Sequence, residues 1–285
     1  MGKKTKKGKA AIIILSVIII AAAAAAAVYF LAFDTLTVVS DSAFSQVLPK
    51  MTTARLRAAY ALKGVRLRMT RLSDDCFRSR ELFSAYIGRI KSDYVLLGPL
   101  SASYAVSSDI NVSDLLPSSA VLAIHGSNGS DLFDCTLVSD VESGWRKAAT
   151  ELSSETSTMS QNVGLVYDND SKSMAEVIIS CFPAGHVTEF DKSSTGRLFA
   201  STSLDQMNKL GIVIAMCPSV SSFNDFFSSD NSVSWITDYR LAPAVPEKNL
   251  YGIVVPDFYG ILETAKGVEK GSHSISVLEY VYEKK

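Results

Sequence analysis

The sequence predicts an α/β protein made of two doubly wound, parallel-sheet lobes that follow one N-terminal transmembrane helix. Three observations predict this architecture. A charge-free apolar segment occupies residues 10–33, short apolar runs then alternate with longer amphipathic runs, and this alternation occurs as two successive series. Strands that alternate with helices are typical of parallel sheets covered by helices on both faces. Two such series therefore indicate two lobes.

The N-terminal segment has the composition of a membrane anchor. Residues 1–9 contain five lysines and no acidic residue, and the 24 residues from Ala10 to Phe33 carry no charge. As a helix the segment would extend roughly 36 Å, enough to cross a hydrocarbon core of about 30 Å. Lysines before the span hold the N-terminus in the cytoplasm. We therefore expect a single-pass protein of the cytoplasmic membrane whose residues from Asp34 onward are extracytoplasmic (periplasmic).

A cleaved signal peptide is the alternative for this segment, because it shares the basic start and the apolar stretch. Apolar regions of signal peptides run about 7 to 15 residues. Here the alanine run 21–27 continues into Val28, Tyr29, Phe30 and Leu31 instead of a polar cleavage region. The length of the apolar segment favours an uncleaved anchor.

The remainder of the chain is mildly acidic. The whole sequence has 28 basic and 29 acidic residues, and removal of the five N-terminal lysines leaves 23 basic residues against 29 acidic ones. A domain that binds nucleic acid would carry a basic excess. We therefore expect no nucleic-acid partner.

The cysteines and histidines do not form a recognisable metal motif. Cys76, Cys135, Cys181 and Cys217 lie 59, 46 and 36 residues apart, without a CxxC pair, and the three histidines are equally scattered. Zinc and redox sites usually contain closely spaced pairs. The sequence thus predicts no metal site and no cofactor. The four cysteines are interpreted as separate buried thiols, although they could form disulfides in three pairings.

The first series begins after the apolar segment. Its apolar runs predict strands, and its amphipathic stretches predict helices over 43–62 and 75–90. The predicted strands are 36–39, 65–69, 94–97 and 121–124, and each of the last two ends at Gly, Pro, Ser or Asn.

The second series starts after a predicted helix over 142–153. Its predicted strands are 163–167, 187–190, 212–216 and 233–237. Its predicted helices are 171–181, 203–210 and 221–227. A final strand over 251–255 and a helix over 258–268 return the chain to the first lobe, and crossing strands near 137–140 and 240–255 join the lobes. We expect each lobe to have its own sheet, and a single continuous sheet would contradict this prediction.

Three segments resemble type 1 periplasmic binding proteins, the fold shared by bacterial solute receptors and the ligand domains of some repressors. Asp93-Tyr-Val-Leu-Leu-Gly-Pro-Leu-Ser-Ala is similar to the third-strand segment with its small-residue ligand loop. Asn162-Val-Gly-Leu-Val-Tyr-Asp is similar to the strand that opens the second lobe, and Leu250-Tyr-Gly-Ile-Val-Val-Pro-Asp-Phe-Tyr-Gly to the return into the first. The resemblance covers about residues 34–279. It implies a first lobe (34–140, completed by about 250–285) and a second lobe (141–249), which follow the basic tail (1–9) and the transmembrane helix (10–33) predicted from composition.

The resemblance also implies a binding site between the lobes. Open α/β sheets bind ligands outside the carboxyl ends of their strands, and two facing sheets form a cleft that closes by hinge motion. The polar and aromatic residues expected there suit a small polar ligand of the amino acid, sugar or nucleoside class. The candidate ligand-binding residues are Asp41, Phe44, Ser101, His125, Tyr167, Asp238 and Asp257. Each could instead be a helix N-cap or turn residue, the ordinary role of polar residues after strands.

Enzyme motifs find no support in the sequence. The segment Gly126-Ser-Asn-Gly129 lacks the Lys-Ser/Thr ending of a P-loop, the surroundings of Ser101 are not a Gly-x-Ser-x-Gly elbow, and HExxH is absent. We expect a binding protein and no catalytic residues. The favoured function is a membrane-tethered solute receptor that delivers its ligand to an ABC-type permease. The alternative is a tethered sensory or protein-interaction domain of the same fold.

Overall fold

A computed structural model describes residues 4–41, 50–126, 131–157, 162–191, 205–216, 232–239 and 241–285. All eleven described strands belong to one hydrogen-bonded order, β2-β1-β3-β4-β5-β11-β10-β9-β8-β6-β7. A strand group is defined here on each side of β11 (Ser274–Lys284). The first group is β1 (Asp34–Ser40), β2 (Val65–Arg71), β3 (Tyr94–Leu97), β4 (Ala120–Ile124) and β5 (Cys135–Asp140). The second group is β6 (Val163–Tyr167), β7 (Val187–Asp191), β8 (Ile212–Met216), β9 (Ser234–Asp238) and β10 (Leu250–Pro256).

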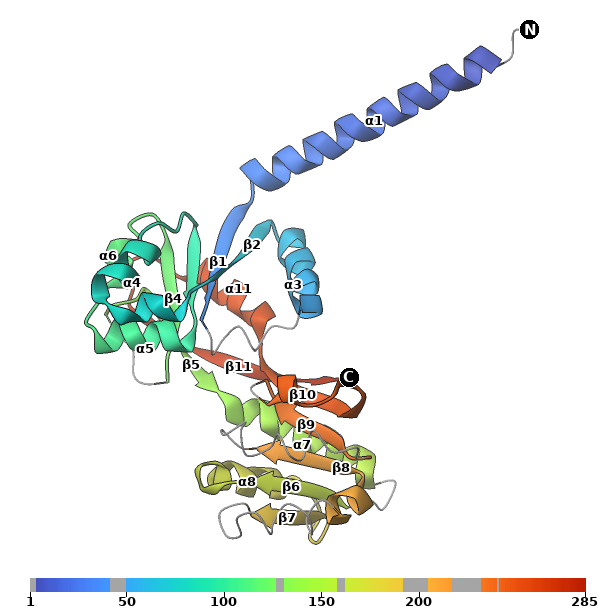
Figure 1. Cartoon of the computed structure of the whole chain (residues 1–285), viewed down its shortest axis with the longest axis vertical. Coiled ribbons are helices and arrows are strands. Elements are labelled where there is room, and N and C mark those ends of the chain that lie inside the picture. The colour runs from blue at the N-terminus through green and yellow to red at the C-terminus, as the bar shows by residue number, and fades with distance from the viewer. Residues whose placement is uncertain are drawn as a thin grey trace.

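Strand β11 connects the two groups and corrects the expectation of two separate sheets. Its residues 274–279 pair in parallel with β5, and residues 280–284 pair antiparallel with β10. No residue of β11 belongs to both pairings, because the strand is long enough to leave one group before it enters the other. The groups are therefore distinct but hydrogen-bonded end to end (Figure 1). Within each group all the pairings are parallel, as predicted.

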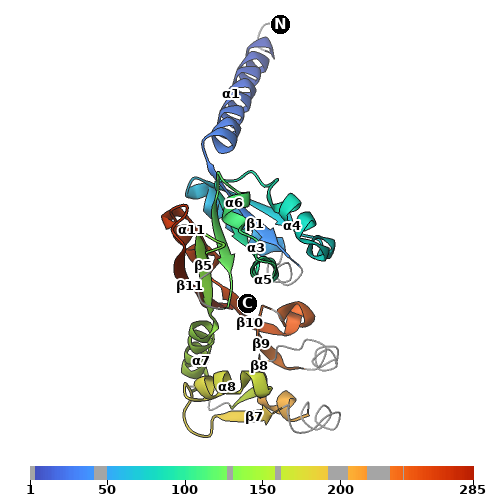
Figure 2. The same cartoon turned by 90° about the vertical axis from the view of Figure 1, so that its left-hand side faces the viewer.

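Helices cover both faces of the sheet. One continuous core joins both groups to the helices α3 (Lys50–Leu62), α7 (Val141–Ser157), α8 (Lys172–Ile179) and α11 (Phe258–Gly267). A second core packs the opposite face of the first group against α4 (Arg80–Ile87), α5 (Pro99–Ser107) and α6 (Val112–Leu115). Figure 2 shows α7 and α11 on one side and α4 on the other. This two-sided cover is the doubly wound arrangement.

Several predicted helix boundaries change. The predicted helix 75–90 is divided into a 3-10 turn, η1 (Asp74–Arg78), and α4, because the Ser79 hydroxyl accepts a hydrogen bond from the Leu82 N–H and caps a new helix. The predicted helix 171–181 likewise becomes η2 (Asn169–Ser171) followed by α8. Part of the predicted helix 43–62, the start of 203–210 and all of 221–227 lie outside the described residues.

Short turns connect the larger elements. Gly64, with φ at +75°, allows the tight connection from α3 into β2, a backbone region that other residues rarely adopt. The 3-10 turns η5 (Ala242–Ala244) and η6 (Glu247–Asn249) lead from β9 into β10. The Tyr60 hydroxyl donates to the carbonyl of Phe258 and so ties α3 to the start of α11.

The N-terminal helix does not support the predicted localisation. Helix α1 (Lys4–Leu31) projects away from the strands (Figure 1). Among the described residues, no helix has both the length and the apolar character required to span a membrane. The predicted transmembrane helix 10–33 and single-pass membrane localisation, with a cytoplasmic N-terminus and periplasmic domain, are therefore corrected.

Candidate functional site

A cavity of about 230 Å³ lies where the carboxyl ends of strands from both groups meet. Helix α5 and β4 contribute from the first group, β9 contributes from the second, and β5, α7 and β11 border it where the groups connect. The lining residues are Pro99, Ser103, Ile124, His125, Gly126, Ser139, Val141, Asp238, Tyr239 and Tyr280. Ligands of open α/β sheets bind at this edge of the strands.

Two tyrosines form an aromatic wall of the cavity. The rings of Tyr239 and Tyr280 are stacked, with centroids 6.2 Å apart and planes inclined by 30°. The hydroxyl of Tyr280 donates to Ser139 Oγ over 3.5 Å, which links β11 to β5. A flat ring surface beside hydroxyl groups can contact the apolar face of a small polyhydroxylated molecule and hydrogen-bond its edge.

Asp238 is the carboxylate of this cavity. It is the last residue of β9, is buried, and accepts a hydrogen bond from the Leu241 N–H through Oδ1 over 3.2 Å. The same carboxylate therefore orders the turn after β9 and borders the cavity. His125 lines the opposite side, directly after β4, where its backbone N–H donates to the carbonyl of Leu137. The structure thus brings the predicted residues His125 and Asp238 to one cavity.

Asp41 and Ser101 interact with each other next to this cavity. Both are fully buried, and Asp41 Oδ2 accepts hydrogen bonds from the backbone N–H of Ser101 at 2.9 Å and from its hydroxyl at 3.1 Å. Ser101 lies in the first turn of α5, where the sequence predicted a loop. The carboxylate satisfies an N–H that the helix leaves without an intrahelical partner. This pair positions α5, whose residues Pro99 and Ser103 line the cavity.

Two further candidates are not placed in the cavity. Tyr167 ends β6, and its hydroxyl donates over 2.7 Å to Oε2 of Glu189, which lies on the neighbouring strand β7. Phe44 lies outside the described residues.

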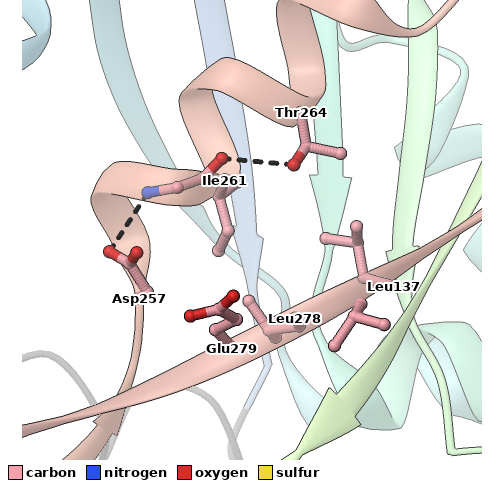
Figure 3. A pocket seen from close by; sticks show the side chains of 8 residues that line it. Leu137, Asp257, Ile261, Thr264, Leu278 and Glu279 are labelled. Atoms are coloured by element: carbon pink, nitrogen blue, oxygen red, sulfur yellow. Dashed lines mark hydrogen bonds between the residues drawn. The ribbon is translucent and has the colours of Figure 1, made fainter.

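Asp257 borders a different pocket, also of about 230 Å³, between α11, β11 and β5 (Figure 3). Its Oδ1 accepts hydrogen bonds from the N–H groups of Tyr259 and Gly260 at 3.0 and 3.1 Å, so Asp257 is the N-cap of α11. Burial, assisted by the Asp257 carboxylate, raises the pKa of the nearby Tyr60 hydroxyl. The second strand group contributes no lining residue to this pocket in the part of the chain that is described. The pocket therefore lacks the two-sided character of the first cavity.

Sequence reasoning missed Ser139 and Tyr280 as cavity residues. Tyr280 belongs to β11, a strand that was not predicted. Alternating polar and apolar residues over 274–277, and again over 278–280, are the signal that could have identified it. Ser139 lies in β5, within the crossing strand predicted near 137–140. Its position beside Tyr280 depends on the pairing of β5 with β11.

The described cysteines are thiols, and their placement agrees with the interpretation of separate side chains. Cys76 and Cys135 are buried and Cys181 is half-buried. Cys217 lies outside the described residues. Within the described residues, no group of three His, Cys, Asp or Glu side chains is arranged to hold a metal ion.

Comparison with known proteins identifies the fold. No family model and no curated protein matches this chain at the level of sequence. Among solved structures, an ABC transporter solute-binding protein from Conexibacter woesei is similar with a TM-score of 0.54 and 11% identity, over 88% of each chain. This similarity shows the fold of type 1 periplasmic binding proteins, in agreement with the resemblance seen in the sequence.

Two further structures have lower TM-scores. A sugar transporter from Clostridium phytofermentans gives 0.42 with 13% identity, over 89% of this chain and 99% of the other. A LacI family transcriptional regulator from Enterococcus faecium, solved with bound ribose, gives 0.43 with 12% identity, over 88% and 97%. The fold assignment rests on the Conexibacter protein.

Proposed function

We propose that the chain is a solute receptor that binds a small neutral polyhydroxylated molecule, such as a monosaccharide, in the cavity bordered by His125, Asp238 and Tyr280. The observation that carries the proposal is that residues at strand ends of both groups border this one cavity. Asp41 and Ser101 act as its supporting pair, through α5. The assignment of residues 34–140 and 250–285 to one lobe and 141–249 to the other belongs to the same proposal.

The lining favours a neutral ligand over an amino acid. Among the described residues that border the cavity there is no lysine or arginine, and Asp238 is the acidic one. An amino acid would place its carboxylate near this acid without a cation among the described lining residues to balance it, at an electrostatic cost. Sugar hydroxyls can instead donate to a carboxylate and accept from hydroxyl or imidazole groups. The volume of about 230 Å³ lies below the roughly 300–1,000 Å³ of sites for drug-sized molecules, and suits a molecule of monosaccharide size.

The similar fold of the Conexibacter protein, named as an ABC transporter solute-binding protein, supports a role in delivering the solute to an ABC-type permease. Hinge motion between two groups joined through few strands would close the cavity around the ligand. Closure would bring Asp238 and Tyr239 toward His125 and Ser103.

Thermal melting of the full chain against a panel of monosaccharides, polyols, nucleosides and amino acids tests this proposal. A ligand at a hundredfold excess over its Kd stabilises the folded state by about 2.7 kcal/mol. We expect a sugar or polyol to raise Tm and Asp238→Asn to weaken this binding at least tenfold.

The matched control is Asp168→Asn. Asp168 comes directly after β6 of the second group and, like Asp238, accepts a backbone N–H of the following turn through its Oδ1, but it does not border the cavity. Equal losses in Asp238→Asn and Asp168→Asn would contradict the site, and a panel without any stabilising sugar or polyol would contradict the ligand class.

A further inference from the structure

A second pocket, of about 400 Å³, lies at the outer edge of the first strand group and contains three cationic side chains. Its cations are Arg68 on β2 and Arg89 and Lys91 in the loop from α4 to β3. Its hydroxyl groups belong to Thr37, Thr70 and Tyr86. The basic pocket is defined here by these six residues.

The strand register explains why these side chains share one pocket. Thr37 pairs with Arg68 in the parallel ladder of β1 and β2, so both residues lie on the same face of the sheet, and Thr70 follows on that face two residues later. Helix α4 packs on this face through Phe83 and Ile87. The loop after α4 then brings Arg89 and Lys91 to the same place.

The basic pocket is separate from the proposed sugar cavity. The loop that carries Arg89 and Lys91 leads into the amino end of β3, whereas the cavity lies beyond the carboxyl ends of β4 and β9. The two sites share no lining residue. Figure 1 shows β2, which carries Arg68, near the end of α1 and away from the second strand group.

The cations of the basic pocket have no acidic partner within the described residues. Arg68, Arg89 and Lys91 are exposed and form no ion pair there. Cations elsewhere on the described surface do pair with acids, as in Lys147–Glu279 at 3.3 Å and Lys284–Glu155 at 2.6 Å. The nearby Asp93 uses its Oδ2 to accept from the Thr35 N–H. Three uncompensated cations in a chain of net charge −1 mark a local excess of positive charge.

The cationic surface continues beyond Arg68. An adjoining pocket of about 380 Å³ shares Arg68 and is also bordered by Arg57 and Arg66. Arg66 Nη2 donates to Thr35 Oγ1 at 2.8 Å, which fixes its guanidinium against the sheet. A ligand with more than one anionic group could therefore contact both pockets through Arg68.

We propose that the basic pocket binds a small phosphate-bearing molecule, with Arg68, Arg89 and Lys91 as the binding residues. Guanidinium groups donate two parallel hydrogen bonds to a phosphate, and the lysine ammonium adds a point charge. The hollow shape, which extends between β2 and the loop after α4, favours a small phosphate ester over an extended polyanion.

Isothermal titration calorimetry of the full chain with pyrophosphate and with inorganic phosphate tests this inference. We expect saturable binding that is tighter for pyrophosphate and that weakens as NaCl is raised from 50 to 300 mM, because salt screens exposed charges. Arg68→Gln and Arg89→Gln should each weaken pyrophosphate binding by about tenfold, the effect of losing one charge-assisted hydrogen bond. Both side chains are exposed, so the variants should keep the wild-type Tm in phosphate-free buffer to within about 2 °C.

Lys172→Gln is the matched control, because it removes one exposed cation from α8, a helix that packs against the second strand group. It should bind pyrophosphate as the wild type does. An equal loss in Lys172→Gln and Arg89→Gln, or no saturable binding in the wild type, would overturn the site.

A separate experiment tests vesicles of phosphatidylglycerol and a single-stranded oligonucleotide as ligands. Binding to either of these without binding to pyrophosphate would overturn the small-molecule assignment. A sugar that binds the cavity should bind Arg89→Gln unchanged, so the two proposals fail independently.

Discussion

Gly144 on α7 permits the closest helix–sheet contact among the described glycines of the helices. A Cβ atom at this position would lie 2.6 Å from Tyr280 Cβ and 2.7 Å from Val254 Cγ1. Ordinary contacts of this kind begin at 3.4 Å, so α7 would have to move away from β11 by about 0.8 Å. Tyr280 Cβ is attached directly to the backbone of β11 and cannot rotate away. Gly144→Ala should therefore disturb the packing beneath the aromatic wall of the cavity.

Two effects of Gly144→Ala oppose each other. Alanine in place of glycine within a helix stabilises it by about 1 kcal/mol, whereas overpacking a core contact costs about 1–3 kcal/mol. The overlap with a backbone-anchored atom places the cost at the upper end of that range, so we expect a net loss of about 2 kcal/mol. For a domain of this size such a loss lowers Tm by about 4–8 °C.

Urea denaturation and thermal melting of Gly144→Ala and Gly267→Ala measure the effect. Gly267 ends α11, the other helix that flanks β11, and a Cβ there would meet no atom within 4 Å. Gly267→Ala should leave stability unchanged or raise it slightly. If Gly144→Ala proves as stable as Gly267→Ala, the tight packing of α7 on β11 is refuted, and with it the fixed position of Tyr280.

Two further predictions concern single hydrogen-bonded groups. Asp257→Ala should lower stability by about 1 kcal/mol because α11 loses its N-cap, whereas Asp257→Asn should preserve the cap, as chemical denaturation of the pair would show. Hydrogen bonds from Lys284 and Tyr251 lower the pKa of Glu155. A lowered carboxyl pKa adds stability above the ordinary value near 4.5, and this stability is lost as pH falls through the folded-state pKa. The wild type should thus exceed Lys284→Met in stability at pH 7, and the difference should shrink below pH 4.5; a difference that stays constant down to pH 3 would contradict this account.

Local hydrophobic runs made most strands predictable. The run Ile212–Met216 was predicted with the bounds that the structure gives to β8, because five consecutive apolar residues form a strand buried within its group. Helix α5 was missed for a different reason. The residues after the predicted strand 94–97 were interpreted as a loop, although proline also favours the first position of a helix.

Strand β11 was missed because it does not have a continuous apolar run. Ile275 and Val277 are 59% and 61% exposed, while Leu278 and Tyr280 are buried. A strand with one exposed face reads as alternation, and here the alternation is interrupted at Val277-Leu278. The expectation of two separate sheets failed at this strand, since only β11 pairs with both β5 and β10 in the described part of the chain.

The order of the strands explains which predicted site residue of the second group reached the cavity. Asp238 and Tyr167 both end strands of this group, and both were candidate ligand-binding residues. Strand β9 lies next to β10, which β11 connects to the first group, whereas β8 intervenes between β9 and β6. With strands spaced about 4.8 Å apart, Tyr167 lies roughly 10 Å farther from the junction than Asp238. The distance of a strand from β11 is a property of long-range pairing, and neither residue type nor position after a strand contains that information.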